Sequence, residues 1–103
     1  MGASDRSVIA RRIREARLLK GWTQEELGIR ARIGKDSASP RVNQYERGVH
    51  APEYFTAERL ARALDVPTPY LYARDDDMAQ LILALGRLST SERRKLLKTL
   101  VGG

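Results

Sequence analysis

Cysteine is absent from this sequence, and histidine occurs once, at position 50. Without cysteine the chain forms neither disulfides nor thiolate metal sites, which suits a reducing cytoplasm. His50 lies in a turn with no Asp, Cys or second His nearby, so neither metal binding nor catalysis is expected of it. No apolar run approaches the roughly 20 residues that a membrane span requires, and no signal peptide opens the chain. These absences predict a cytoplasmic protein without a membrane partner.

Motifs for catalysis and cofactor binding are missing as well. The sequence has no Gly-rich phosphate loop, no nucleophile elbow and no pair of carboxylates spaced for acid–base chemistry. The run Asp75-Asp76-Asp77 is acidic, but consecutive carboxylates point in different directions, so a solvated linker is expected rather than a magnesium site. The 103 residues leave no room for a sizeable ligand-sensing domain. The sequence therefore predicts no enzyme, cofactor, metal or small-molecule effector.

The charge that is present is basic and unevenly placed. The net charge is +6, and residues 1–52 hold 11 Lys and Arg against 6 Asp and Glu, whereas residues 53–103 hold 8 against 7. With 42% hydrophobic residues, the chain can form the core of one compact domain. A basic half beside a nearly neutral half indicates a surface in the first half that binds a polyanion.

Two helices are expected near the N-terminus, after a disordered lead-in at residues 1–6. The first has Ser7 as its N-cap, follows apolar residues at helical spacing and ends before Gly21. The second begins with a capping box, in which Thr23 and Glu26 each bond the other's backbone. The outer face of the first helix is expected to carry Arg11, Arg12, Arg14 and Arg17.

A third helix is expected from Ser39 to Arg47. Ser39 is a suitable N-cap, Pro40 suits the first helical position, and Gly48 can end the helix in the left-handed conformation. Val42 and Tyr45 share one face, which is expected to be buried. The remaining surface carries side chains that can donate to phosphates or base edges: Ser39, Arg41, Asn43, Gln44 and Arg47.

Four more short helices complete an all-α fold. One has Thr56 at its N-cap, one lies at residues 70–72, one spans residues 78–88, and the last opens with a capping box of Ser89 and Glu92. Because the second and third helices are joined by a Gly-containing turn, their order indicates a helix-turn-helix.

Several stretches resemble the phage-repressor/Cro-type (XRE-like) helix-turn-helix family. They are Trp-Thr-Gln-Glu-Glu-Leu at residues 22–27, Val-Asn-Gln-Tyr-Glu-Arg-Gly at residues 42–48, and a proline four residues later, Pro52. Residues 56–72 are similar to the family's fourth and fifth helices, so the likeness covers residues 8–73. The resemblance implies a compact five-helix repressor-like domain followed by a C-terminal helical hairpin. The boundaries expected for these two parts are residues 7–74 and 75–103.

The resemblance also implies roles for individual residues. Gln24 and Arg47 take positions that contact phosphate, and Arg17 and Glu46 take positions where some members form a salt bridge. The positions that usually face bases are Ser39, Pro40 and Gln44.

One departure from the family leaves the start of the third helix open. The segment before Val42 is about four residues longer than in the shortest members, which is about one helical turn. We prefer a longer loop, but the helix can instead begin near Asp36, with Pro40 in its first turn. In that case Ser37 and Arg41 move toward the bases. The predicted DNA-contacting residues are therefore Gln24, Ser37, Ser39, Pro40, Arg41, Asn43, Gln44 and Arg47.

The resemblance implies a bacterial or phage transcriptional regulator, such as a repressor, that binds double-stranded DNA at the nucleoid. An antitoxin whose hairpin binds a protein partner is the alternative, while the basic first half argues against an adaptor that has lost DNA binding. The hairpin carries more large apolar side chains than it can hide by closing on itself. Packing of the hairpin back on the domain is one way to cover the surplus. We prefer a homodimer, which would cover it and also supply the symmetry of a palindromic operator. Its predicted contacts are Met78, Leu81, Ile82, Leu85, Leu88, Leu96, Leu97 and Leu100.

Overall fold

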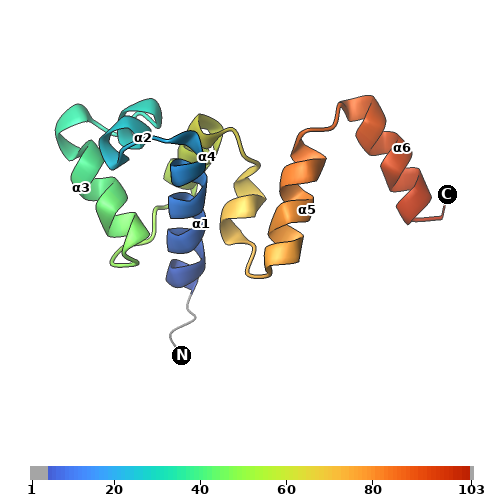
Figure 1. Cartoon of the computed structure of the whole chain (residues 1–103), viewed down its shortest axis with the longest axis horizontal. Coiled ribbons are helices and arrows are strands. Elements are labelled where there is room, and N and C mark those ends of the chain that lie inside the picture. The colour runs from blue at the N-terminus through green and yellow to red at the C-terminus, as the bar shows by residue number, and fades with distance from the viewer. Residues whose placement is uncertain (1–4, 103) are drawn as a thin grey trace.

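The computed structural model describes residues 5–102, with side chains from residue 8 onward. This part of the chain is all-α, with six α-helices and one short 3-10 helix, η1 (Figure 1). No helix within it is long and apolar enough to cross a membrane. The elements are α1 (Asp5–Lys20), α2 (Gln24–Arg30), α3 (Lys35–Glu46), α4 (Tyr54–Leu64), η1 (Thr68–Tyr72), α5 (Asp76–Gly86) and α6 (Thr90–Leu100).

One core holds the first five elements together. Each of them contributes at least one fully buried aliphatic side chain to it, and Ala79 of α5 is buried in the same cluster. Figure 1 shows α2 and α3 on one side of α1 and the C-terminal helices on the other. The large side chains at the centre of the core are Ile13, Leu27, Val42, Leu60, Leu64 and Leu71.

The predicted ends of α1 and α2 are partly confirmed. Gly21 follows α1 with a φ of +72°, and the capping box of α2 forms, with Thr23 Oγ1 accepting from the Glu26 backbone at 3.0 Å. However, α1 begins at Asp5 rather than after Ser7. The lead-in expected at residues 1–6 is therefore wrong for its last two residues, and residues 1–4 lie outside the described chain.

Helix α3 begins at Lys35, so the preferred start at Ser39 is wrong and the alternative near Asp36 is correct to within one residue. Pro40 lies inside the helix, where it removes a backbone hydrogen bond. Packing accounts for the additional turn, because Ala38 is fully buried beside Gly28 of α2. A β-carbon added to Gly28 would lie only 2.6 Å from that of Ala38. The close approach of α2 and α3 therefore requires residues 35–38 to be helical.

Two further expectations need correction. Helix α4 is capped by Glu53, whose carboxylate accepts from the Thr56 backbone at 2.7 Å, so Thr56 lies in the first turn rather than at the N-cap. Arg12 and Arg17 are only 2% and 9% exposed instead of lying on the outer face of α1. The Arg12 guanidinium donates to the Ala73 carbonyl (2.9 Å) and to the Asp76 carboxylate (3.0 Å). Arg12 thereby ties α1 to the start of α5.

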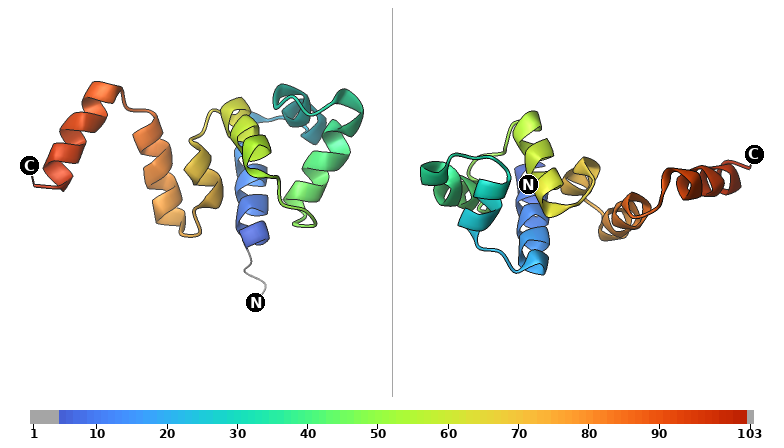
Figure 2. Two further views of the ribbon diagram at one scale, coloured as in Figure 1. Left: turned by 180° about the vertical axis from the view of Figure 1, so that it is seen from behind. Right: turned by 90° about the horizontal axis from the view of Figure 1, so that it is seen from above.

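The C-terminal arm, which we define as α5 and α6, is not a closed hairpin. Helix α5 packs against η1, and its Gly86 approaches Pro67 closely. Helix α6 opens with the predicted capping box of Ser89 and Glu92, but none of its residues is buried. Figures 1 and 2 show α6 leading away from α5. The expectation that the hairpin closes on itself is therefore wrong.

Candidate nucleic-acid interface

Helix α3 has a buried apolar face and an exposed polar face. Ala38, Val42 and Tyr45 repeat at i, i+4 and i+7 and are buried against the rest of the domain. The early start of the helix extends the polar face by one turn toward Lys35. Six of the predicted DNA-contacting residues are exposed on this helix or at its C-cap: Ser37, Ser39, Pro40, Arg41, Gln44 and Arg47.

Gln24 and Asn43, the other two predicted contacts, are half-buried and hydrogen-bonded to each other. Asn43 Nδ2 donates to Gln24 Oε1 at 3.3 Å, and Gln24 Nε2 donates to Glu46 Oε1 at 3.2 Å. An amide nitrogen carries two hydrogens, so Nε2 keeps one that can be donated to a ligand. These bonds fix the Gln24 amide at the start of α2, beside the polar face of α3.

A buried ion pair supports this arrangement. Arg17 Nε donates to Glu46 Oε2 at 2.6 Å, and Nη2 donates to Oε1 at 2.9 Å. The side chains are 10% and 2% exposed, and the remaining Arg17 amine donates to the Trp22 carbonyl at 2.8 Å. The hydrogen bonds to Glu46 raise the pKa of Arg17 above its ordinary value, although burial opposes the shift. This is the ion pair expected from the sequence, and it joins α1, α3 and, through Gln24, α2.

Basic side chains also gather at the turn between α2 and α3. Arg30, Arg32 and Lys35 are exposed there, next to the N-terminal end of α3. The Arg30 guanidinium carbon lies 4.4 Å from the centre of the Trp22 ring, which holds this side chain in place. Sequence reasoning did not single out these three residues. Their density, three cations within six positions, is the signal that could have identified them.

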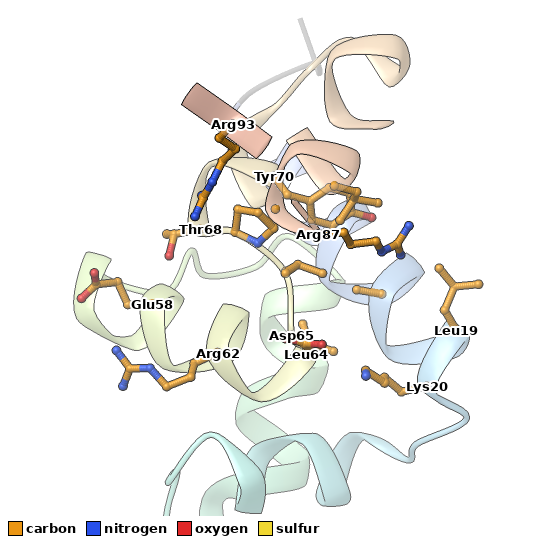
Figure 3. Close-up of a pocket in the computed structure, with 15 residues that line it drawn as sticks. Leu19, Lys20, Glu58, Arg62, Leu64, Asp65, Thr68, Tyr70, Arg87 and Arg93 are labelled. Atoms are coloured by element: carbon orange, nitrogen blue, oxygen red, sulfur yellow. The ribbon is translucent and has the colours of Figure 1, made fainter. Parts of the chain in front are cut away.

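A groove of about 870 Å³ lies away from α3 and is shown in Figure 3. It is lined by α1, α4, η1, the loop between α4 and η1, and the C-terminal arm. No residue of α2 or α3 lines it. Its walls carry both signs of charge, so it has no uniform potential that would attract an anion. The charged lining residues are Lys20, Glu58, Arg62, Asp65, Arg87 and Arg93. The groove is therefore separate from the polar face of α3.

The apolar residues predicted for dimerisation divide into two groups. Ile82 is half-buried and packs against the core of the domain. Leu88 and Leu96 are also half-buried. The exposed members are Met78, Leu81, Leu85, Leu97 and Leu100.

Comparison with known protein families identifies the domain. The model of the helix-turn-helix family matches residues 13–71, which is more than half of the chain. The chain belongs to the XRE-like helix-turn-helix family. In this family's terms, α2 and α3 are the two helices of the motif.

Two transcriptional regulators are similar to this helix-turn-helix protein. The crystal structure of BswR superposes with a TM-score of 0.81 and 37% identity, covering 91% of this chain and 93% of that one. The HTH-type transcriptional regulator ImmR of Bacillus subtilis (strain 168) is 32% identical over 68 residues. That match takes in 66% of this chain but only 50% of ImmR, so the chain spans about half the length of this relative.

Proposed function

We propose that this helix-turn-helix protein is a transcriptional regulator that binds specific sequences of double-stranded DNA. The observation that carries the proposal is the exposed polar face of α3 beside the fixed amide of Gln24. A buried ion pair and two hydrogen bonds orient this amide before any ligand is bound. Such preorganisation lowers the entropy that DNA binding would otherwise cost.

Gln44 is the residue that we assign to base recognition. It is exposed, four residues after Pro40 and three before Arg47, so the three side chains share one stripe of α3. A glutamine amide pairs with adenine through two hydrogen bonds in the major groove, and an apolar ring can contact a thymine methyl. Because α3 starts early, Ser37 and Arg41 would also lie toward the bases. Arg47 would contact phosphate, as would the remaining hydrogen of the Gln24 amide.

We further propose that the protein acts at the nucleoid as a homodimer on a palindromic operator. Five large apolar side chains of the arm are exposed, and a two-fold interface would cover them. A two-fold dimer places its recognition helices about 34 Å apart, one turn of DNA, on the two halves of an inverted repeat. Control by protein concentration follows, because dimerisation and operator binding are then coupled.

Selection of bound duplexes from a random library tests the DNA proposal. An inverted repeat is the expected consensus. Gln44→Ala should weaken binding by about 1–3 kcal/mol per affected base pair and relax the preference there. Arg47→Ala should weaken binding to all sequences alike and reduce the salt slope by about one unit. Arg87→Ala, which removes the same charge at the end of α5, is the matched control. Equal affinity of the wild type for selected and random duplexes would refute the proposal.

Sedimentation equilibrium tests the homodimer. The variant Leu97→Ser/Leu100→Ser replaces two exposed side chains of α6 and should dissociate a wild-type dimer without unfolding the domain. Ile29→Ser makes the same kind of change on α2, where Ile29 is 46% exposed, and should leave the dimer intact. A wild type that sediments as a monomer at tens of micromolar would contradict the proposal.

A further inference from the structure

Within residues 5–102, no element packs extensively against helix α6. Leu97, Leu100 and Val101 are 57%, 71% and 70% exposed. Leu96 is half-buried and lies on the same side, because helical spacing brings residues 96, 97, 100 and 101 onto one face. The apolar stripe of an amphipathic helix is normally covered. Because no described element of this chain covers the exposed part of the stripe, it is available to a second molecule.

The linker before α6 holds it away from its own α5. Only residues 87–89 separate the two helices, and backbone hydrogen bonds fix both ends of this linker. Arg87 N and Leu88 N donate to the Ala84 and Leu85 carbonyls, while the capping box of Ser89 sets the direction in which α6 begins. The two helices consequently diverge, as Figures 1 and 2 show.

Helix α5 presents an uncovered apolar face of its own. Met78, Leu81 and Leu85, at i, i+3 and i+7, are 51%, 56% and 38% exposed. The opposite side of α5 is fixed to the domain through Ala79, which is fully buried, and through the contact of Gly86 with Pro67. The exposed face of α5 is thus a preformed surface on a helix that cannot turn to hide it.

The two helices differ in charge. Helix α5 contains two acidic residues and no basic one. Asp76 is paired with Arg11 and Arg12, which leaves Asp77 as the exposed acid at the N-terminal end of α5. Helix α6 contains four basic residues and a single acid, Glu92. An antiparallel pair would bring Lys98 near Asp77, and the basic N-terminal half of α6 near the negative end of the α5 dipole. Pairing α6 with α6 would instead bring like charges together.

We propose that α6 of each subunit packs antiparallel on α5 of a second copy of this chain, in a reciprocal exchange. The inference rests on the proposed homodimer and names the surfaces that form it. The exchange covers both apolar faces in one isologous interface, since each subunit gives one helix and receives one. The interface is a bundle of α5 and α6 from both subunits, with α5 firmly attached to each DNA-binding domain.

Disulfide trapping tests this pairing directly, because the wild-type chain has no cysteine that could cross-link. Two single variants at positions that the proposed register places opposite each other, Met78→Cys and Leu97→Cys, are purified separately, mixed at tens of micromolar and oxidised mildly. The expected product is a disulfide-linked heterodimer that forms from the mixture and from neither variant alone. Ile29→Cys, mixed with each of them, is the control for random collision.

Each other product overturns the exchange. Cross-linking of Leu97→Cys with itself would indicate α6–α6 pairing, and cross-linking of Met78→Cys with itself would indicate α5–α5 pairing. A double variant that closes a disulfide within one chain, while the mixture gives none, would place α6 on its own α5. Sedimentation of the wild type distinguishes the homodimer proposal from the exchange proposal. A monomer would refute both, whereas a dimer with a different cross-link would refute only the exchange.

Charge reversal gives an independent readout. Asp77→Lys and Lys98→Asp should each weaken self-association by about tenfold. Each substitution puts like charges at both copies of the Asp77–Lys98 contact, and an exposed ion pair contributes only modest energy. Because a mixture of the two variants restores opposite charges at both contacts, it should return to within about twofold of the wild-type affinity. A mixture that remains as weak as the single variants would contradict the exchange.

Discussion

Removal of the Glu46 carboxylate should cost this protein a large part of its stability. The Arg17 side chain is one-tenth exposed and makes three hydrogen bonds, two to Glu46 and one to the Trp22 carbonyl. Glu46→Ala removes the first two and leaves only the bond to the Trp22 carbonyl. It also removes the acceptor of the Gln24 amide. Breaking a buried ion pair by removing one partner costs about 3–5 kcal/mol, and the residual exposure of Arg17 places the expectation at about 3 kcal/mol. For a domain of this size the melting temperature should fall by at least about 10 °C.

Urea unfolding at pH 7 provides the measurement, with Glu25→Ala as the matched control. Glu25 is an exposed acid on α2, so its removal should change the free energy of unfolding by no more than about 0.5 kcal/mol. The double variant Arg17→Met/Glu46→Leu leaves no charge behind, and it should recover more than half of the loss. With the matching single variants Arg17→Met and Glu46→Leu, the double-mutant cycle should show a coupling energy of about 2 kcal/mol or more.

Two results would refute this reasoning. A loss below about 1 kcal/mol for Glu46→Ala would mean that the pair behaves as an exposed one. Additive effects of the Arg17 and Glu46 substitutions would mean that the two charges act independently in the folded protein.

Three further predictions concern packing, the recognition helix and pH. Gly28→Ala should destabilise the protein by about 1–3 kcal/mol, because the added β-carbon would lie 2.8 Å from the backbone of α3. Gly34→Ala is the control, since its β-carbon meets nothing within 4 Å. Equal shifts of the urea midpoint in the two variants would contradict the expected clash. Pro40→Ala should stabilise the protein by about 2 kcal/mol. Alanine is about 3 kcal/mol more favourable than proline inside a helix, but loss of the proline makes the unfolded chain more flexible, which costs about 1 kcal/mol. An unchanged or lower melting temperature would contradict this prediction. The pKa of Asp76 is lowered by hydrogen bonds from Arg11 and then Arg12, so its contribution is present above about pH 4 and is lost as the pH falls further. Asp76→Asn should accordingly show a smaller loss of stability between pH 5 and 3 than the wild type or Asp36→Asn, which removes an exposed carboxylate on α3.

The sequence by itself determined those helix ends whose stabilising bonds lie within one turn. The capping boxes of α2 and α6 bond residues three apart, so both partners are visible in the sequence and both form in the structure. Gly21 and Gly48 mark chain reversals because positive φ costs glycine little, and their φ angles are +72° and +74°. Local chemistry decides these points before any tertiary contact exists.

The resemblance to the repressor family supplied a different kind of information. It placed Arg17 and Glu46, 29 residues apart, at positions where an ion pair can form, although no local pattern relates them. It also implied that Gln24 contacts phosphate, while the polar surface of the third helix indicated Asn43 as a separate contact to DNA. Only the structure reveals that these two amides bond to each other, because the bond depends on how α2 crosses α3.

Tertiary structure decided the remaining features, and in each case a long-range contact outweighs a local preference. Pro40 favours a helix that starts beside it, but burial of Ala38 against Gly28 extends α3 back to Lys35. The arginines of α1 suggest a solvated face, but Arg12 finds carbonyl and carboxylate partners more than 60 residues away. The apolar residues of α6 suggest a hairpin that closes, yet the bonded linker directs this helix away from α5. A local signal gives the propensity of a segment, whereas only the assembled core determines which neighbours are within reach.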